Sequence, residues 1–233
     1  EAALKEAKGI VNRWMAAPEL EGGMEFGRAL RAAGITGCMG HSNATVQEIE
    51  EAMKNGYSCV VHLYSVMSTV TRDNGFRRGG LVEAGLLFDD LDVEIICDGK
   101  HLPPELIRLI YKIKGADRIA LVTDSLALAG TEQTHGFMQD TEFIIEDGVC
   151  KLMDRSAFAG SIATADRLVR VAVKEAGIPL PDAVKMMTQT PARIMGLTSK
   201  GRLAAGMDAD IAVFDRDIRI KAVFATGEPI GMA

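Results

Sequence analysis

Short apolar runs alternate with longer amphipathic segments along much of the chain, and this alternation limits the possible folds more than any other feature. The apolar runs that read as strands lie near 35–39, 58–61, 93–97 and 119–122. They follow one another at about 25 to 35 residues, the spacing of repeated strand–helix units with parallel strands. Such units form either an open doubly wound sheet or a closed barrel.

The segments between these runs have the pattern of helices, and they cover 45–55, 81–88 and 103–114. In the last of these, Pro103 and Pro104 suit a first helical turn, and Gly115 suits a helix end. The apolar residues of this segment fall on one helical face, namely Leu106, Ile107, Ile110 and Ile113. The periodicity therefore predicts an amphipathic helix that packs against the sheet.

One earlier unit of the same kind is expected, with its strand just before Ala17-Pro18-Glu19 and its helix over 24–33. No GxGxxG pattern follows the first strand. That pattern brings the backbone close to a pyrophosphate in dinucleotide-binding folds. Its absence argues against a fold of that type.

After residue 140 the pattern changes. Apolar segments flank Asp147-Gly148, which predicts a β-hairpin over 142–152. Two helices and then two strands are expected after it, at 164–176, 181–187, 210–214 and 222–225. A small β-structure that uses both ends of a longer chain would explain the last two strands.

Composition excludes some classes of function. The 233 residues carry a formal net charge of −6, which argues against a nucleic-acid binder because phosphate neutralisation needs a basic surface. No apolar run reaches the roughly 18 residues of a membrane helix, and no signal-peptide pattern is visible. The expected partner is a small molecule rather than a nucleic acid or a membrane.

The cysteines indicate a reducing compartment. None of the four, at 38, 59, 97 and 150, forms a CxxC pair, and three lie in apolar runs that read as strands. Buried free thiols and a cytoplasmic location are expected. The sequence begins without methionine, in what reads as a helix. We therefore expect a longer protein, in which residues before Glu1 carry part of the active site.

Polar side chains follow four of the predicted strands. His41, His62, Asp98 and Asp124 each come within two residues of the end of an apolar run, and His101 lies three residues beyond Asp98. In a parallel barrel these positions share the face at the carboxyl ends of the strands. A single histidine at a strand end is more often a structural residue. Four polar groups at successive strand ends favour a shared site, since each would be costly to bury without partners.

Imidazole and carboxylate groups are ligands for divalent metals such as zinc. A bound ion lowers the pKa of water toward neutrality, and a nearby carboxylate can accept the water proton and pass it to a leaving nitrogen. Asp124 is the candidate for this acid/base role. Catalytic metal sites usually have three protein ligands, so we expect a further ligand upstream of Glu1.

Two further segments allow two interpretations each. Arg72, Arg77 and Arg78 lie in the Gly-rich segment TRDNGFRRGG, which is either a solvated loop or a phosphate-binding loop. Ala159-Gly160-Ser161 precedes a predicted helix. Its backbone N–H groups could meet an anion, or Ser161 or Thr164 could be an ordinary N-cap.

Taken in order, the motifs resemble those of N-acetylglucosamine-6-phosphate deacetylases, in the amidohydrolase superfamily. The motifs are APE at 17–19, GHSNAT at 40–45, HLY at 62–64, DGKH at 98–101, LVTD at 121–124, AGS at 159–161, PA at 191–192 and GMDAD at 206–210. The resemblance runs from about residue 16 to the end of the chain. No single motif would suffice, but the ordered set is specific.

The resemblance implies an α/β fold: a TIM-like (β/α) barrel of the amidohydrolase type, incomplete at its N-terminus, with part of a small β-sandwich. Residues 1–200 would form the partial barrel and residues 201–233 the sandwich part. His41 and His62 would be metal ligands. Asp124 would be the third residue of this chain at the metal, and the catalytic acid/base that contacts the metal-bound water. Zinc is the expected metal, with iron or manganese as alternatives.

The resemblance also implies how a substrate is held. Asp98, Gly99, Lys100 and His101 match one substrate-contacting loop, and Phe158, Ala159 and Gly160 match a second contact. Ser65, Val66 and Arg77 match the side of the site that holds the phosphate, with Arg72 as an alternative to Arg77. A homodimer is expected, because the family is typically dimeric.

Two departures from the family pattern matter. The metal-binding glutamate of an HLEGP-like motif, and the histidine after it that polarises the carbonyl, are absent from this sequence. Ser65-Val66 stands where the family usually has Asn-Ala, and Gly79-Gly80 where it has Pro-Gly. The expected function is removal of the N-acetyl group from an amino-sugar phosphate, first of all N-acetylglucosamine 6-phosphate. The alternatives are N-acetylgalactosamine 6-phosphate, an N-acyl amino acid, and a non-catalytic sugar-phosphate binding remnant.

Overall fold

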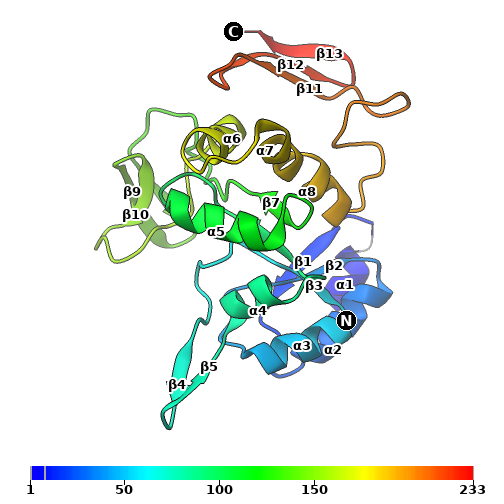
Figure 1. The fold of residues 1–233 in the computed structure, drawn as a ribbon, viewed down its shortest axis with the longest axis vertical. Coiled ribbons are helices and arrows are strands. Elements are labelled where there is room, and N and C mark those ends of the chain that lie inside the picture. The colour runs from blue at the N-terminus through cyan, green and yellow to red at the C-terminus, as the bar shows by residue number, and fades with distance from the viewer. Residues whose placement is uncertain (1, 8, 233) are drawn as a thin grey trace.

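A five-stranded parallel sheet with the strand order β1-β2-β3-β6-β7 is the centre of the fold (Figure 1). The computed structural model describes residues 2–7 and 9–232. The strands of this sheet are β1 Arg13–Ala16, β2 Thr36–Met39, β3 Tyr57–Val60, β6 Asp92–Ile95 and β7 Ile119–Leu121. The four strands predicted from apolar runs, and the earlier strand before Ala17, are all confirmed.

Helix α1 Ala2–Ala7 precedes the first strand. The helices between successive strands of the sheet are α2 Gly23–Ala32, α3 Val46–Lys54, α4 Leu81–Leu87 and α5 Pro104–Lys114. The predicted helices are confirmed to within a residue or two at each end. Helix α3 begins at a capping box, because Thr45 Oγ1 accepts from Glu48 N–H and the Glu48 carboxylate accepts from Thr45 N–H at 2.7 Å.

The strand residues alternate between the two faces of the sheet. One face packs against the helices in the main core, and its fully buried members include Met39, Val60, Val93, Ile95 and Ile119. The other face has a smaller cluster formed by Cys38, Cys59, Val61, Ala120 and Ile194. Side chains alternate along a strand, so residues two apart in a strand lie on the same face of the sheet.

Two antiparallel sheets and three helices follow β7. The first sheet contains β8 His135–Met138, β9 Thr141–Glu146 and β10 Val149–Leu152, and its β9–β10 pair is the predicted hairpin. The helices are α6 Ala165–Lys174, α7 Leu180–Met187 and α8 Gln189–Ile194. The second sheet contains β11 Ile211–Phe214, β12 Ile220–Ala225 and β13 Glu228–Met232, and it lies at one end of the molecule (Figure 1).

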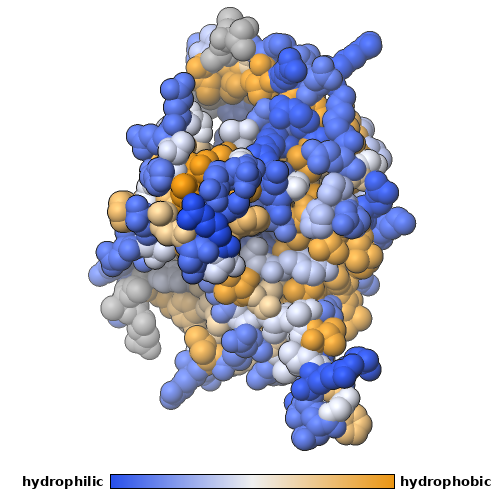
Figure 2. Space-filling model, turned by 90° about the vertical axis from the view of Figure 1, so that its left-hand side faces the viewer, coloured by the Kyte–Doolittle hydropathy of each residue, from blue (hydrophilic) through white to orange (hydrophobic). Residues whose placement is uncertain are grey.

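The segment 71–80, interpreted from the sequence as a loop, contains two short strands. The Gly-rich segment forms a hairpin of β4 Thr71–Asp73 and β5 Phe76–Arg78, which projects from the body of the molecule (Figures 1 and 2). Its turn is Asn74-Gly75, with φ of 48° and 86°. Positive φ at both central residues is the geometry of the tight turns that match strand twist, and Asn-Gly is the dipeptide that adopts it most readily.

All four cysteines are buried and free, as predicted. Among the residues that the structure describes, no helix combines the length and the apolarity that a bilayer crossing requires.

Candidate active site

His41, His62 and Asp124 line one cavity of about 380 Å³. They follow β2, β3 and β7, at the carboxyl ends of these parallel strands. The rest of the cavity wall is formed by Arg13, Met15, Val61, Glu94 and Val122. Three of the four strand-end residues predicted to share a site are therefore brought together. Asp98, the fourth, is not among the residues that line this cavity.

The two imidazoles face each other across the cavity. Their Nε2 atoms are 3.2 Å apart, and their ring centroids are 5.0 Å apart. Two nitrogens bound to one tetrahedral zinc ion at its usual bond length would be about 3.3 Å apart, so the spacing fits two ligands of one ion. It also fits a hydrogen bond between two neutral rings.

The pair supplies only part of a metal site. Within residues 2–7 and 9–232, no group of three or more His, Cys, Asp or Glu side chains is arranged to hold a metal ion. Asp124 shares the cavity with the imidazoles but does not complete such a group. The donor set present here is therefore two imidazole nitrogens, with a carboxylate nearby.

Burial favours the neutral form of the His62 imidazole. Burial lowers the pKa of its imidazole, and the nearby Asp124 carboxylate offsets only part of this effect. In the described part of the chain the buried Nδ1 of His62 has no hydrogen-bond partner. A metal ligand must be a neutral imidazole, so the lowered pKa favours the ligating form near neutral pH.

The same three residues have an unusual backbone. His41, His62 and Asp124 have φ values of 49°, 30° and 49°, in the left-handed region that side chains other than glycine rarely adopt. Each such residue costs about 1–3 kcal/mol, and residues of this kind cluster at active sites. The sharp turn at the end of each strand directs the side chain into the cavity.

A partly buried ion pair, which the sequence analysis did not predict, forms part of the cavity wall. Arg13 donates two hydrogen bonds to the Glu94 carboxylate, one of them from Nη2 to Oε2 at 3.0 Å. Glu94 is 4% exposed, and burial raises the pKa of its carboxyl although the Arg13 guanidinium opposes this. Burying a glutamate in an apolar strand costs free energy unless the carboxylate has a partner. Glu94 within the apolar run was therefore a sequence signal for such a pair.

A second polar cluster lies at the end of β6. Asp98 is 2% exposed, and its Oδ1 accepts from the N–H groups of Lys100 and His101 at 2.8 Å each. Its Oδ2 lies 2.9 Å from Nδ1 of His101. The His101 ring meets the Phe158 ring edge-on, with centroids 5.0 Å apart. The fold thus brings together two of the predicted substrate segments, 98–101 and 158–160.

These contacts set the charge of Asp98. Burial alone would raise the pKa of its carboxyl, but hydrogen bonds from the His101 ring and from the two backbone N–H groups hold it below its usual value. Asp98 is therefore a carboxylate at neutral pH and can only accept hydrogen bonds. Nδ1 of His101 must then carry the proton.

Replacement of Asp98 by asparagine tests this assignment through stability. Because the folded-state pKa is lowered, ionised Asp98 stabilises the protein above its unfolded pKa of about 4, and this stabilisation is lost as the pH falls through the folded value. We expect Asp98→Asn to lower the free energy of unfolding by about 1–3 kcal/mol at pH 7. In denaturant titrations, the difference should shrink below about pH 4. The exposed Asp140→Asn is the control, and a pH-independent difference would contradict the assignment.

The phosphate-side residues are not brought to the cavity. Ser65 donates its N–H to the carbonyl of His62, so it lies near that strand end, while Val66 is 68% exposed. Arg77 lies on β5, opposite Arg72 on β4, and both are exposed on the projecting hairpin. Within the described residues, neither arginine lines the cavity of His41 and His62.

The Ala159-Gly160-Ser161 segment is not a helix N-cap. Of the two predicted N-caps, Thr164 occupies the N-cap position of α6; its hydroxyl donates to the Asp166 carboxylate and does not accept from a backbone N–H of the helix. The N–H of Ala159 donates to the carbonyl of Cys150 at 3.1 Å, so it is already used within the protein. Gly160 lies against the backbone of Asp124, where an added Cβ would approach the Asp124 carbonyl oxygen to 3.0 Å.

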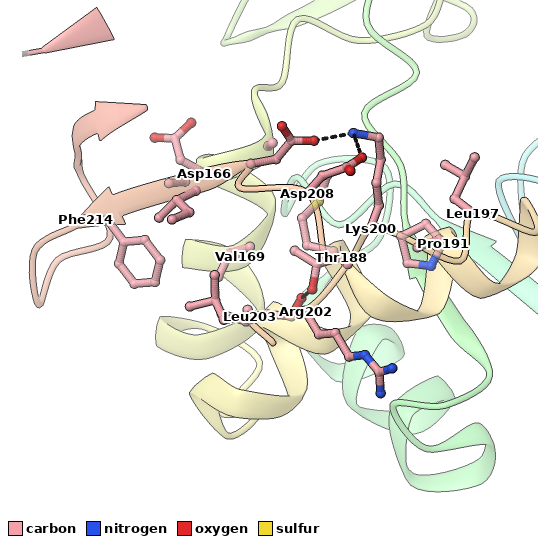
Figure 3. A pocket seen from close by; sticks show the side chains of 18 of the residues that line it. Asp166, Val169, Thr188, Pro191, Leu197, Lys200, Arg202, Leu203, Asp208 and Phe214 are labelled. Carbon is pink, nitrogen blue, oxygen red and sulfur yellow. Dashed lines mark hydrogen bonds and ion pairs between the residues drawn. The ribbon is translucent and has the colours of Figure 1, made fainter. Parts of the chain in front are cut away.

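A larger cavity of about 540 Å³ lies between helices α6 to α8 and the C-terminal sheet (Figure 3). Apolar side chains dominate its walls, among them Val169, Leu203 and Phe214, while Lys200 pairs with Asp208 and Asp210 at its edge. None of the predicted site residues lines this cavity. The smaller cavity is therefore the candidate active site.

Comparison with known proteins shows which family the chain resembles. The N-acetylgalactosamine-6-phosphate deacetylase of Shewanella sp. (strain ANA-3) is 32% identical, over 86% of this chain and 50% of that protein. The N-acetylglucosamine-6-phosphate deacetylase of Lysinibacillus sphaericus is 30% identical, over 94% of this chain and 58% of that protein. The chain thus spans about half the length of these curated relatives.

Solved structures give the same result. The N-acetylglucosamine-6-phosphate deacetylase of Pasteurella multocida superposes with a TM-score of 0.91 at 28% identity, over 98% of this chain and 59% of that one. A mutant of the Mycobacterium smegmatis enzyme, in complex with N-acetyl-D-glucosamine-6-phosphate, has a TM-score of 0.91 at 31% identity, over 98% of this chain and 60% of that one. The sequence profile of the amidohydrolase family matches residues 24–230, and this chain belongs to that family.

Proposed function

We propose that the complete protein is a metal-dependent hydrolase that removes the N-acetyl group from an amino-sugar phosphate. N-acetylglucosamine 6-phosphate is the first candidate substrate, with glucosamine 6-phosphate and acetate as products. The observation that carries the proposal is the convergence of His41, His62 and Asp124 on one cavity at the carboxyl ends of parallel strands. Relatives named as deacetylases of such sugar phosphates support the substrate class.

The proposed architecture is a (β/α) barrel, of which the five parallel strands form a part. Residues 1–200 would be the catalytic domain, and residues 201–233 part of a small β-sandwich. We propose a homodimer in the cytoplasm. The similarity to solved deacetylases over nearly the whole chain supports the barrel architecture.

His41 and His62 are the residues that would hold the divalent metal, for which zinc is the first candidate. The ion, when bound, supplies Lewis-acid chemistry and makes water a better nucleophile near neutral pH. Asp124 accepts a proton from the attacking water and donates it to the nitrogen of the departing amine. One water is consumed, the amide C–N bond breaks, and acetate and the free amine leave.

Other residues of this chain would hold the sugar. The proton on Nδ1 of His101 is fixed by Asp98, which orients the ring and presents Nε2 to a ligand. Gly99, Lys100, Phe158, Ala159 and Gly160 would complete the contacts around the sugar. Ser65, Val66 and Arg77 are proposed for the phosphate, and Ser65 could donate one hydrogen bond from its hydroxyl.

The test is acetate release by the complete protein from four substrates: N-acetylglucosamine 6-phosphate, N-acetylgalactosamine 6-phosphate, unphosphorylated N-acetylglucosamine, and an N-acetyl amino acid. We expect kcat/KM for a 6-phosphate to exceed that for the unphosphorylated sugar by about 100-fold, because charge-assisted contacts to phosphate are lost without it. Preference for the amino acid would refute the substrate class. A protein without metal and without activity on all four would instead be a binding remnant.

A further inference from the structure

The segment 159–163 is attached to the turn that carries Asp124. The N–H of Ser161 donates to the carbonyl of Asp124 at 2.8 Å, and the N–H of Leu126 donates to the carbonyl of Ser161 at 2.9 Å. Ser125 and Ser161 form an isolated parallel bridge through these bonds. Ser161 therefore pairs with the chain just beyond β7 as a residue of a parallel strand would.

The Ser161 hydroxyl adds a second set of contacts to the same turn. Its Oγ donates to the carbonyl of Thr123 and accepts from the N–H of Ala163 at 3.0 Å. The residue is 1% exposed, so water does not compete for these bonds. This one side chain thus ties the residue before Asp124 to the start of the segment that enters α6.

Ser125 makes a reciprocal contact from the other side. Its Oγ donates to the carbonyl of Ala163, and it lies 3.4 Å from the Oγ of Ser161. Gly160, with φ of 62°, lets the two backbones approach closely, since a Cβ there would meet both the Asp124 carbonyl oxygen and the Leu126 side chain. The two hydroxyls and the two backbone hydrogen bonds together form what we call the serine clamp.

Asp124 needs such a clamp because of its own backbone. Its φ of 49° is in the left-handed region, which a residue with a side chain holds only when its surroundings enforce it. The serine clamp engages the carbonyls of Thr123 and Asp124 and the N–H of Leu126, on both sides of the strained residue. Proton transfer is sensitive to the placement of the carboxylate, since a misplacement of about 1 Å can cost about 100-fold in rate.

We propose that Ser161 and Ser125 are positioning residues that hold Asp124 in its strained conformation for proton transfer. The inference rests on the proposed acid/base role of Asp124. Neither serine contacts the reacting atoms; each acts through the backbone that carries the carboxylate.

The experiment uses the complete protein and three variants, Ser161→Ala, Ser161→Thr and Ser125→Ala, with Ser199→Ala as an exposed control far from the turn. We expect Ser161→Ala to lower kcat by about 10- to 100-fold while KM changes less than about 3-fold, because substrate contacts are intact. Ser161→Thr, which keeps the hydroxyl, should recover most of kcat. Ser125→Ala should lower kcat less, by about 3- to 10-fold, because it removes one bond of the clamp.

A double variant separates positioning from a general structural role. If Ser161 acts through Asp124, then adding Ser161→Ala to Asp124→Asn should leave the residual rate unchanged within about 2-fold. The proposal would be overturned if Ser161→Ala lowered the rate by the same factor in the unmodified protein and in Asp124→Asn. Full kcat in Ser161→Ala would overturn it as well. If Ser161→Ala does not fold, Ser125→Ala in the two backgrounds decides by the same criteria.

A second readout does not depend on activity. Loss of the Ser161 hydroxyl should speed hydrogen exchange at the Leu126 amide by at least about 10-fold, since that amide closes the clamp. Unchanged exchange at Leu126 would overturn the clamp even if the enzyme were inactive. If the unmodified complete protein did not deacetylate but Leu126 exchanged faster in Ser161→Ala, the proposed function would be refuted. The clamp itself would still stand.

Discussion

Replacement of Asp124 by asparagine in the complete protein is expected to lower kcat for deacetylation by about 10³-fold, within the range that general acid–base groups contribute. Asparagine has the same shape as aspartate but cannot accept the water proton. It also tolerates the left-handed conformation found at this position, where φ is 49°. The backbone turn should therefore survive, and the loss would report the missing proton acceptor.

The measurement is the rate of acetate release under saturating substrate, with the metal content determined on the same sample. Asp140→Asn is the matched control, since this exposed carboxylate lies in the turn between β8 and β9, away from the cavity. Activity of Asp124→Asn close to that of the unmodified protein would remove Asp124 from the mechanism. Loss of metal together with activity would assign Asp124 a ligand role in addition to proton transfer.

The sequence predicts the parallel sheet and three residues of the cavity because both depend on local patterns. Apolar strands and amphipathic helices repeat with the spacing of parallel strand–helix units, and in such units the carboxyl ends of the strands meet at one edge. His41, His62 and Asp124 were therefore expected to converge from their positions alone. The lining of the observed cavity contains all three.

Other features depend on pairings between distant residues. Arg13 and Glu94 are 81 residues apart in the chain, and only the assembly of the sheet, in which β2 and β3 separate β1 from β6, brings them together. Ser161 is 38 residues from Thr123, so the serine clamp cannot be read from local propensity. The β4–β5 hairpin is different, because Asn74-Gly75 is a local signal, hidden in a Gly- and Arg-rich segment whose strands are short and fully exposed.

Metal binding and proton transfer can be tested separately, because the proposal assigns the first to the two imidazoles and the second to Asp124. Their spacing fits two ligands of one ion, while the carboxylate at Asp124 lies in the same cavity without completing a three-ligand group. Variants of the histidines should therefore affect metal content first and rate as a consequence. Variants of the Asp124 turn should affect the rate while the metal remains bound.

Replacement of His62 by asparagine is accordingly expected to reduce metal affinity by more than 100-fold, since even residues that only support a ligand contribute about 10- to 100-fold. Asparagine tolerates the φ of 30° at this position, so the strand end should be kept. Equilibrium dialysis of the complete protein against zinc measures the affinity directly, and denaturant unfolding checks the fold.

His135→Asn provides the control for that experiment, because His135 is an exposed histidine on β8 whose ring contacts Thr134 and does not line the cavity. The unmodified protein and His135→Asn should bind zinc equally, while His62→Asn and His41→Asn should both bind it weakly. Equal binding by all four proteins would mean that the 3.2 Å contact is a hydrogen bond between imidazoles rather than a pair of ligands. Loss in His62→Asn alone would assign one ligand and leave His41 as its hydrogen-bonded neighbour.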